Sequence, residues 1–265
     1  MCEWGGYMKR IVVLWLSCFV LLGAKVDINI ENNKSAIICL GKELASIRNM
    51  LEIYAQITGG IKYKLPKERL RQSLEELEVL LDALGSRYGS DAIVTSSTKS
   101  ARVLWKPVKK ILENALVKNV DRKTLKRKVV YVHDHIRGTI KNISKMKAHI
   151  IEISNINHIA EINAALEIGA SSRRLSAHYM MKLLDVNDPT IEKHYQQGLK
   201  RYAEALHILK ASKPSQKTLD MLRIFEKRLH YFKNIWNMHI FTPALVVKKA
   251  NEVFFKSTEL AYSIR

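Results

Sequence analysis

The chain has 265 residues, of which 47% are hydrophobic, so it can bury a sizeable core in one large domain or in two small ones. Its 11 glycines and 5 prolines are few for a protein built from sheets and tight turns, and this scarcity favours long helices. The formal net charge of +19 comes from basic residues spread along most segments, without the basic and aromatic blocks, zinc-ligand spacing or recognition helix of a nucleic-acid-binding protein. We therefore expect a solvated basic surface and no nucleic-acid partner.

The N-terminal segment has the layout of a secretory signal peptide. Two basic residues precede an apolar run over residues 11–22, and two small residues follow, the second of them Ala24. We therefore predict export to the periplasm, with residues 1–24 as the signal peptide. A leucine stands where the cleavage site prefers a small residue, so an uncleaved anchor in the inner membrane stays an alternative, although a membrane-spanning helix needs about 20 apolar residues. The chain could start at Met1 or at Met8, just before the basic pair.

Apolar residues spaced three and four apart predict three helices in the first half of the chain and the start of a fourth. The first ends at a pair of glycines that suits a C-cap, Gly59 and Gly60, and the second opens at Pro66 in the first-turn position that proline prefers. Small hydroxyl residues offer caps for the third helix, in which Pro107 is expected to cause a kink or a break. Asp121 is predicted to cap the fourth. The predicted bounds are about 31–58 for the first helix, from 66 to a close at Gly85 and Gly89 for the second, 99–117 for the third and from 122 onward for the fourth.

The fourth helix is expected to continue into a fifth. No proline occurs between its start and about Leu184, and the helical pattern of apolar residues does not stop. One helix of around 60 residues, roughly 90 Å long, would then connect the two halves. A bend near residues 155–157 would shorten it. Three further helices are predicted after it, starting at Asp188-Pro189, Pro214-Ser215 and Thr242-Pro243.

The two halves repeat each other at an offset of 125 positions (173 − 48 for one arginine pair). The counterpart of Ala45-Ser46-Ile47-Arg48 is Ala170-Ser171-Ser172-Arg173. Coinciding leucines can follow from the helical period alone, whereas the shared Ala-Ser-x-Arg sequence indicates a duplicated module. We therefore predict an all-α fold of two tandem antiparallel four-helix bundles, joined by a long connecting helix. The predicted divisions are 1–24 for the signal peptide or anchor, 31–120 for the first module, 121–154 for the connecting helix and 155–265 for the second module.

The second copy resembles a known family. Its segment Gly169–His178, GASSRRLSAH, is similar to the signature on the first helix of the NarX-like or PilJ-like N-terminal sensor domain, which runs roughly A-G-x-x-R-M-x-S-x-R. That domain lies on the periplasmic side of nitrate and nitrite sensor kinases and of the methyl-accepting chemotaxis transducers of type IV pili. The resemblance covers residues 162–265, and residues 37–112 more weakly as a degenerate first copy. Arg174 stands where methionine is usual in the signature, and His178 where a second arginine often stands.

The resemblance implies a site for a small oxyanion. In the nitrate sensors the signature arginine contacts the anion near a dimer axis, and by motif position that residue is Arg173 here and Arg48 in the first copy. A guanidinium offers a planar fork of donors that suits planar or tetrahedral oxyanions. We therefore hypothesise that the two copies form an internal pseudo-dimer in which Arg48 faces Arg173 across one site. The further candidate ligand-binding residues are Ser171, Arg174, Ser176 and His178.

The histidines and the remaining motifs indicate no catalysis. Five histidines lack a helical i, i+4 pair backed by carboxylates, so we expect them to be solvated or to cap helices rather than to bind a metal. They are His133, His135, His149, His158 and His178. No nucleophile–base pair and no phosphate-binding loop occurs either. We therefore predict a protein that is not an enzyme and that has no metal and no cofactor.

Two functions remain open. The first is a periplasmic sensor-type module that binds a small oxyanion such as nitrate or nitrite. The second is a structural helical bundle that docks on a membrane receptor, another signalling partner or a pilus component and binds no small ligand. The second would suit an arginine that pairs with a carboxylate in its own helix, and Glu52 lies one turn after Arg48. Whether Arg48 and Arg173 converge in the fold distinguishes the two functions.

Overall fold

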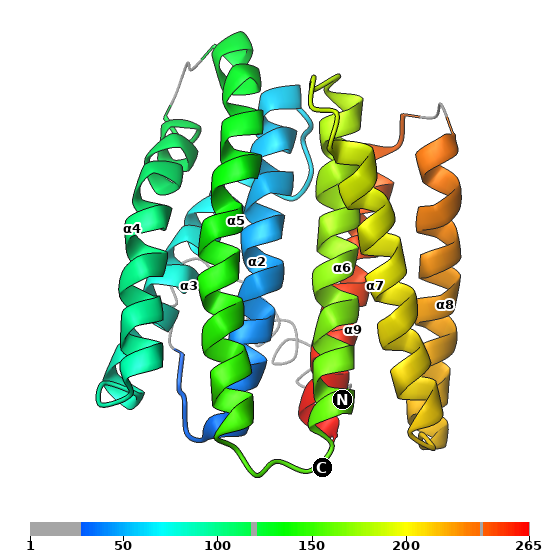
Figure 1. The fold of residues 1–265 in the computed structure, drawn as a ribbon. Coiled ribbons are helices and arrows are strands. Elements are labelled where there is room, and N and C mark those ends of the chain that lie inside the picture. The colour runs from blue at the N-terminus through cyan, green and yellow to red at the C-terminus, as the bar shows by residue number, and fades with distance from the viewer. Residues whose placement is uncertain (1–27, 118–120, 239–240, 265) are drawn as a thin grey trace, which may run out of the picture.

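The structure, a computed structural model, describes residues 28–117, 121–238 and 241–264 (Figure 1). These residues form eight α-helices and no β-strand, so the predicted all-α class is confirmed. None of the described helices combines the length and the apolar composition needed to span a membrane. The predicted signal segment lies outside the described residues. The helices are α2 (Asn33–Gly59), α3 (Pro66–Arg87), α4 (Ala92–Asn114), α5 (Arg122–Glu152), α6 (Ile159–Leu183), α7 (Ile191–Ala211), α8 (Gln216–Asn237) and α9 (Pro243–Ser263).

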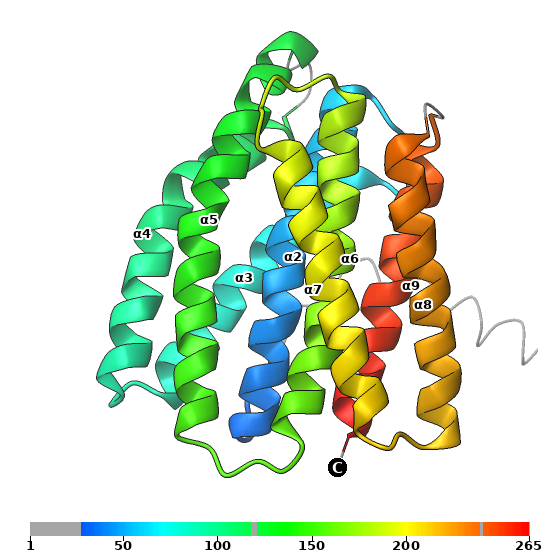
Figure 2. The same ribbon diagram turned by 45° about the vertical axis from the view of Figure 1, so that its right-hand side comes forward.

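Helices α2 and α6 lie side by side at the centre of the molecule (Figures 1 and 2). Helices α3, α4 and α5 lie on the α2 side, where α5 packs against both α2 and α4. Helices α7, α8 and α9 lie on the α6 side, where α7 and α9 both pack against α6. Both central helices are covered by neighbours and carry long runs of buried residues.

Small residues let the central helices approach their neighbours closely. A Cβ atom added at Gly41 of α2 would lie 2.6 Å from Leu166 Cδ1 of α6, closer than real Cβ contacts allow. Ala45 of α2 and Ala170 of α6 are almost fully buried as well. Larger side chains would push the helices apart, so the small residues of the repeated segment serve helix packing.

Local sequence signals set several helix ends where they were predicted. Gly60 adopts the left-handed conformation, with φ 68°, that ends α2, and Pro66 is the first residue of α3. The side chain of Asp121 accepts hydrogen bonds from two backbone N–H groups at the start of α5, and Ser215 accepts one at the start of α8. These four helix ends are confirmed, and each has a local chemical cause.

Helix α4 begins well before the predicted start at residue 99. Asp91 Oδ1 accepts hydrogen bonds from two backbone N–H groups of the first turn, at 2.9 Å each, and so caps the helix from Ala92. The hydroxyl residues 96–98, predicted as caps, lie inside the helix. The helix continues through Pro107 rather than breaking there.

The prediction of one unbroken connecting helix between the two halves is wrong. Helix α5 ends at Glu152, and α6 begins at Ile159 after a loop in which the chain reverses direction (Figure 1). Helix α5 packs against α2 and α4, while α6 packs against α2, α7 and α9. Because packing of an apolar face supplies most of a helix's stability, both segments turn inward instead of forming an exposed rod. The bend allowed near residues 155–157 falls in this loop, but the periodic pattern does not show that the chain reverses direction there.

Candidate functional site

Two cavities flank the contact between α2 and α6. The first, named here the basic cavity, has a volume of about 320 Å³ and is lined by residues of α2, α5, α6 and α7. The second, named the mixed cavity, has a volume of about 450 Å³ and is lined chiefly by residues of α2, α3, α6 and α9. Each cavity therefore uses both central helices and two outer ones.

Cations dominate the basic cavity. Its lining residues, among those the structure describes, include no aspartate or glutamate but five basic side chains: Arg48, Arg137, Lys141, Arg174 and Arg201. Arg48 is buried, Arg174 is half-buried, and the other three lie at the exposed rim. The cavity thus concentrates positive charge around a space that opens to solvent.

Arg48 has an unsatisfied guanidinium. The residue is only 7% exposed, and its Nη1 atom is buried without a hydrogen-bond partner among the described residues. Burial lowers the pKa of Arg48, while the carboxylate of Glu167 raises it and the charge of Arg201 lowers it. Glu52, the expected partner within α2, instead accepts a hydrogen bond from Gln56 Nε2 at 2.9 Å. Arg48 therefore has a buried donor left unsatisfied, and a bound acceptor would reach it only after the surrounding side chains rearrange.

Glu167 of α6 offsets part of the positive charge. Ser171 Oγ donates a hydrogen bond to Glu167 Oε1 at 2.8 Å and so holds this carboxylate. The pKa of Arg174 is lowered to about 9, chiefly by burial and then by Arg48, whereas Glu167 raises it. The pKa of Lys147 is lowered to about 8, again chiefly by burial, with Glu167 acting in the opposite direction. One carboxylate thus acts on three cations, so the cluster keeps a positive balance.

Arg173 lies on the other side of the α2–α6 contact and lines the mixed cavity. Its Nη1 donates to Asn49 Oδ1 at 2.9 Å and to Asn251 Oδ1, and its guanidinium carbon lies 4.8 Å from the ring centre of Phe254. Arg48 and Arg173 therefore line different cavities. The predicted arrangement, in which they face each other across one site, does not occur.

The other predicted site residues separate into two groups. Arg174 and His178 line the basic cavity together with Arg48. Ser171 and Ser176 are fully buried and line neither cavity. Ser171 instead holds Glu167, and the Ser176 hydroxyl has no hydrogen-bond partner among the described residues. Three of the six candidate residues thus meet in the basic cavity.

The two cavities occupy equivalent places in the internal repeat. Residues 125 positions apart line one cavity each, beginning with Arg48 in the basic cavity and Arg173 in the mixed cavity. The further pairs, basic cavity first, are Arg174 with Asn49, His194 with Arg69, Gln197 with Gln72, and Arg201 with Glu76. The mixed cavity also contains Glu43, whose pKa burial raises to about 8, with Glu76 raising it further. The repeat therefore supplies one arginine to each cavity, and only the basic cavity lacks carboxylates in its described lining.

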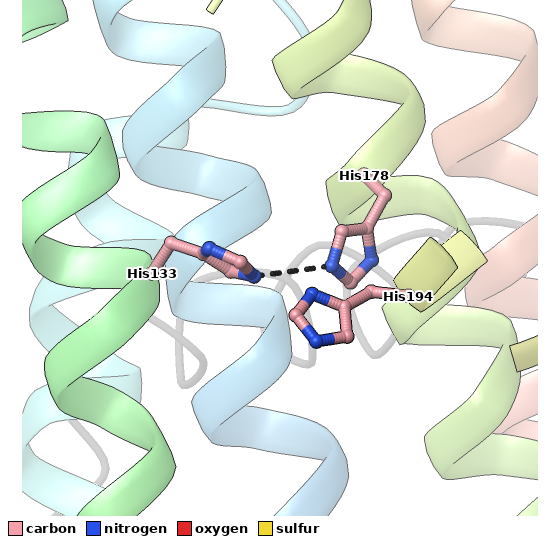
Figure 3. A group of neighbouring side chains, drawn as sticks. All are labelled: His133, His178 and His194. Atoms are coloured by element: carbon pink, nitrogen blue, oxygen red, sulfur yellow. Dashed lines mark hydrogen bonds between the residues drawn. The ribbon is translucent and has the colours of Figure 1, made fainter. Parts of the chain in front are cut away.

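Three histidines from three helices converge at the basic cavity (Figure 3). His133 of α5, His178 of α6 and His194 of α7 line it, and their ligand nitrogens lie within 4.8 Å of one another. His133 and His178 are 4% and 5% exposed, so the prediction that these two are solvated or cap helices is wrong. Burial is the main cause that lowers the pKa of all three, to about 3 for His178.

The remaining predicted histidines lie elsewhere. His149 Nε2 is 2.8 Å from Asp91 Oδ2, while His135 and His158 are exposed. His194 is the member of the cluster that sequence spacing does not single out. The one sequence signal for His194 is the offset of 125, which pairs it with Arg69. This pairing points to a site only after the structure shows that Arg69 lines the mixed cavity and His194 the basic cavity.

Comparison with known proteins identifies no relative. No protein-family model matches the chain, and neither a curated protein nor a solved structure matches it. The similarity to the NarX-like or PilJ-like sensor domain therefore stays a prediction made from the residues themselves.

Proposed function

We propose that the protein is a non-enzymatic module that binds a small oxyanion, such as nitrate or nitrite, in the basic cavity. The observation that carries the proposal is the buried Arg48 Nη1, which has no partner in the part of the chain that the structure describes, together with a cavity whose described lining has five cations and no carboxylate. Buried donors of this kind favour an acceptor with negative charge. The cavity volume of about 320 Å³ leaves room for a small oxyanion and several waters, each of which occupies about 30 Å³.

The positions of Arg48 and Arg174 indicate how anion binding would change the packing of the central helices. Arg48 belongs to α2 and Arg174 to α6, and each lines the same cavity. Their charges repel, which is why Arg48 lowers the pKa of Arg174. An anion between them would favour the arrangement in which the central helices lie close together. Such a difference in affinity between two helix arrangements is the minimum that a sensor needs.

We propose further that the fold arose by tandem duplication. In this reading α2–α5 form one antiparallel four-helix module and α6–α9 form the second, so α5 is the last helix of the first module rather than a separate connector. The contacts among the helices and the equivalent cavity linings support this division. Export to the periplasm is proposed from the N-terminal sequence, and a sensor role from the resemblance to the NarX-like or PilJ-like domain.

A structural bundle that docks on a receptor or a pilus component is the second candidate. The separation of Arg48 and Arg173 into different cavities favours it, since their convergence was the feature expected of the anion-binding function. Exposed apolar side chains on outer surfaces favour it as well, because Val103 of α4 and Phe255 of α9 are each 66% exposed. In that case the basic cavity would bind no small anion.

Isothermal titration calorimetry on the full chain tests the proposal, with nitrate, nitrite and phosphate as separate titrants. We expect saturable binding to the wild type. Arg48→Ala or Arg174→Ala should weaken it about 10- to 150-fold, since a charge-assisted hydrogen bond contributes about 1.5–3 kcal/mol. Circular dichroism of each variant confirms that the fold is kept.

Arg173→Ala is the matched control, because Arg173 is the neighbour of Arg174 in sequence but lines the other cavity. We expect this variant to bind as the wild type does. Binding that is lost with Arg173→Ala and kept with Arg48→Ala would exclude the basic cavity as the site. If none of the three anions binds, the docking function is favoured instead.

A further inference from the structure

We infer that His133, His178 and His194 form a binding site for a divalent transition-metal ion that prefers imidazole nitrogen, such as Zn²⁺. The inference rests on the arrangement of these three side chains. It does not require that the basic cavity bind an oxyanion.

The spacing of the three rings suits a single ion. In a tetrahedral zinc site with metal–nitrogen distances of about 2.0–2.1 Å, two ligand nitrogens lie about 3.3 Å apart. His133 Nε2 and His178 Nε2 are 3.2 Å apart, and all three ligand nitrogens lie within 4.8 Å of one another. Figure 3 shows one ring nitrogen of His194 turned toward the other two rings. A small rotation of this half-buried side chain would complete a three-nitrogen site.

The hydrogen bonds made by the Nδ1 atoms of His133 and His178 leave the Nε2 atoms, which face each other, without a proton. His133 Nδ1 lies 3.0 Å from Asp188 Oδ2, and His178 Nδ1 lies 2.7 Å from the carbonyl oxygen of Arg174. A carboxylate and a carbonyl can only accept, so Nδ1 carries the proton of each neutral ring and Nε2 carries a lone pair. Figure 3 marks a hydrogen bond between these two nitrogens, which lie 3.2 Å apart, but in these tautomers neither nitrogen has a proton to donate, so two lone pairs face each other and repel. A metal ion between them replaces that repulsion with two bonds.

His194 adds a third nitrogen that lacks a partner. Its Nδ1 is buried and accepts or donates no hydrogen bond among the described residues. Burial also disfavours the protonated form of the histidines, because it lowers the pKa of all three. Neutral imidazole is the form that binds a metal.

Asp188 holds the His133 ring in the metal-binding tautomer. Its other oxygen, Oδ1, accepts hydrogen bonds from Thr190 N at 2.8 Å and from Thr190 Oγ1 at 2.7 Å. These two bonds hold the carboxylate in the orientation in which it contacts His133. A carboxylate in this position orients a ligand histidine and raises its basicity, as is usual behind zinc-binding histidines. The site therefore has a supporting residue as well as three ligands.

The surrounding charges select the class of ion. Asp188 and Asp134 attract a cation bound at His133, whereas Arg137 repels it. Arg174 repels a cation bound at His178. Mg²⁺ and Ca²⁺ bind through oxygen ligands and are disfavoured by three neutral imidazoles among arginines. Zn²⁺, Co²⁺, Ni²⁺ and Cu²⁺ bind imidazole well. The fourth coordination position would face the basic cavity, where water or an anion can reach it.

Titration of the full chain with Co²⁺, followed by visible absorption, tests the inference on protein prepared without a histidine tag and without added anions. We expect one equivalent of Co²⁺ to give the absorption bands of a tetrahedral site, and Zn²⁺ to displace it. His194→Ala should abolish these bands, and Asp188→Asn should weaken binding about 10- to 100-fold. A wild-type chain that gives no tetrahedral bands would overturn the inference.

His207→Ala is the matched control, because His207 lies on α7 like His194 but is exposed on its surface. This variant should bind Co²⁺ as the wild type does. His194 is half-buried, so His194→Ala is expected to keep the fold, and circular dichroism of the two variants checks this. Equal Co²⁺ binding by His194→Ala and the wild type would contradict the site even if the wild type binds metal. The anion titrations, which are done without metal, fail or succeed independently of this result.

Discussion

Replacing Arg48 with methionine removes a buried cation while keeping the length of the side chain. We expect Arg48→Met to stabilise the anion-free protein, because the unpaired Nη1 costs about 1–3 kcal/mol and the charge repels Arg174. The attraction between Arg48 and Glu167 is lost, but Glu167 still acts on Arg174 and Lys147. The expected net rise in the free energy of unfolding is about 1–2 kcal/mol, or about 2–8 °C in Tm for a chain of this size.

Urea unfolding followed by circular dichroism, with and without nitrate or phosphate, measures this effect. An anion that binds the folded state should stabilise the wild type as its concentration rises, whereas Arg48→Met should gain nothing. Arg173→Met is the control. Arg173 also has a buried nitrogen, Nε, without a partner among the described residues, but its Nη1 donates to Asn49 and Asn251 and its guanidinium lies against Phe254, so its loss should lower stability even without anion. If Arg48→Met lowers the stability of the anion-free protein as Arg173→Met does, Arg48 is an ordinary packing residue and the reasoning fails.

Two further predictions concern the mixed cavity and the helix contact. Burial raises the pKa of Glu43 from 4.5 to about 8, so the folded chain binds more protons than the unfolded chain in this interval and stability falls as pH rises through it. Glu43→Gln should therefore be neutral below pH 4.5 and stabilising above pH 8, and parallel urea-unfolding profiles for the two chains would contradict this. Gly41→Ala should be less stable than Gly85→Ala by about 1–3 kcal/mol. A Cβ at Gly41 would lie 2.6 Å from Leu166 Cδ1, whereas no atom of the described residues lies within 4 Å of one at Gly85. The two substitutions gain about the same helix propensity, since each replaces glycine with alanine inside a helix. Equal Tm values for the two variants would therefore contradict the close contact at Gly41.

Helix ends were predictable where one residue decides them. Gly60, Pro66, Asp121 and Ser215 end or begin helices through their own conformation or hydrogen bonds, which depend little on the rest of the fold. The start of α4 was not predicted, because Asp91, which caps it, was not considered and the hydroxyl residues 96–98 have a similar preference for the cap position. The turn between α5 and α6 depends on long-range packing, which the local pattern does not contain.

The arginine pairing shows what an internal repeat can and cannot predict. The offset of 125 pairs Arg48 with Arg173, but residues that a repeat pairs do not have to meet. In the structure Arg48 and Arg174 share one cavity, while Arg173 and Asn49 share the other. Neighbouring residues on a helix point about 100° apart, so one step along α6 changes the cavity that a side chain enters.

The histidine cluster was hidden for a different reason. His133, His178 and His194 come from three helices, so no regular spacing within one helix brings them together. Burial of His133 and His178 depends on how α5 and α6 pack around α2, which the sequence pattern does not specify. A search for metal ligands at i, i+4 spacing therefore passes over them.

The central claim is that the basic cavity holds an oxyanion, and anomalous diffraction from crystals grown with selenate tests it most directly. Selenate is tetrahedral and doubly charged, and its selenium marks its position. The account predicts an anomalous peak in the cavity between the guanidinium groups of Arg48 and Arg174, where the unpaired Nη1 of Arg48 gains an acceptor. A peak beside Arg173 instead, or none in the basic cavity, would contradict it.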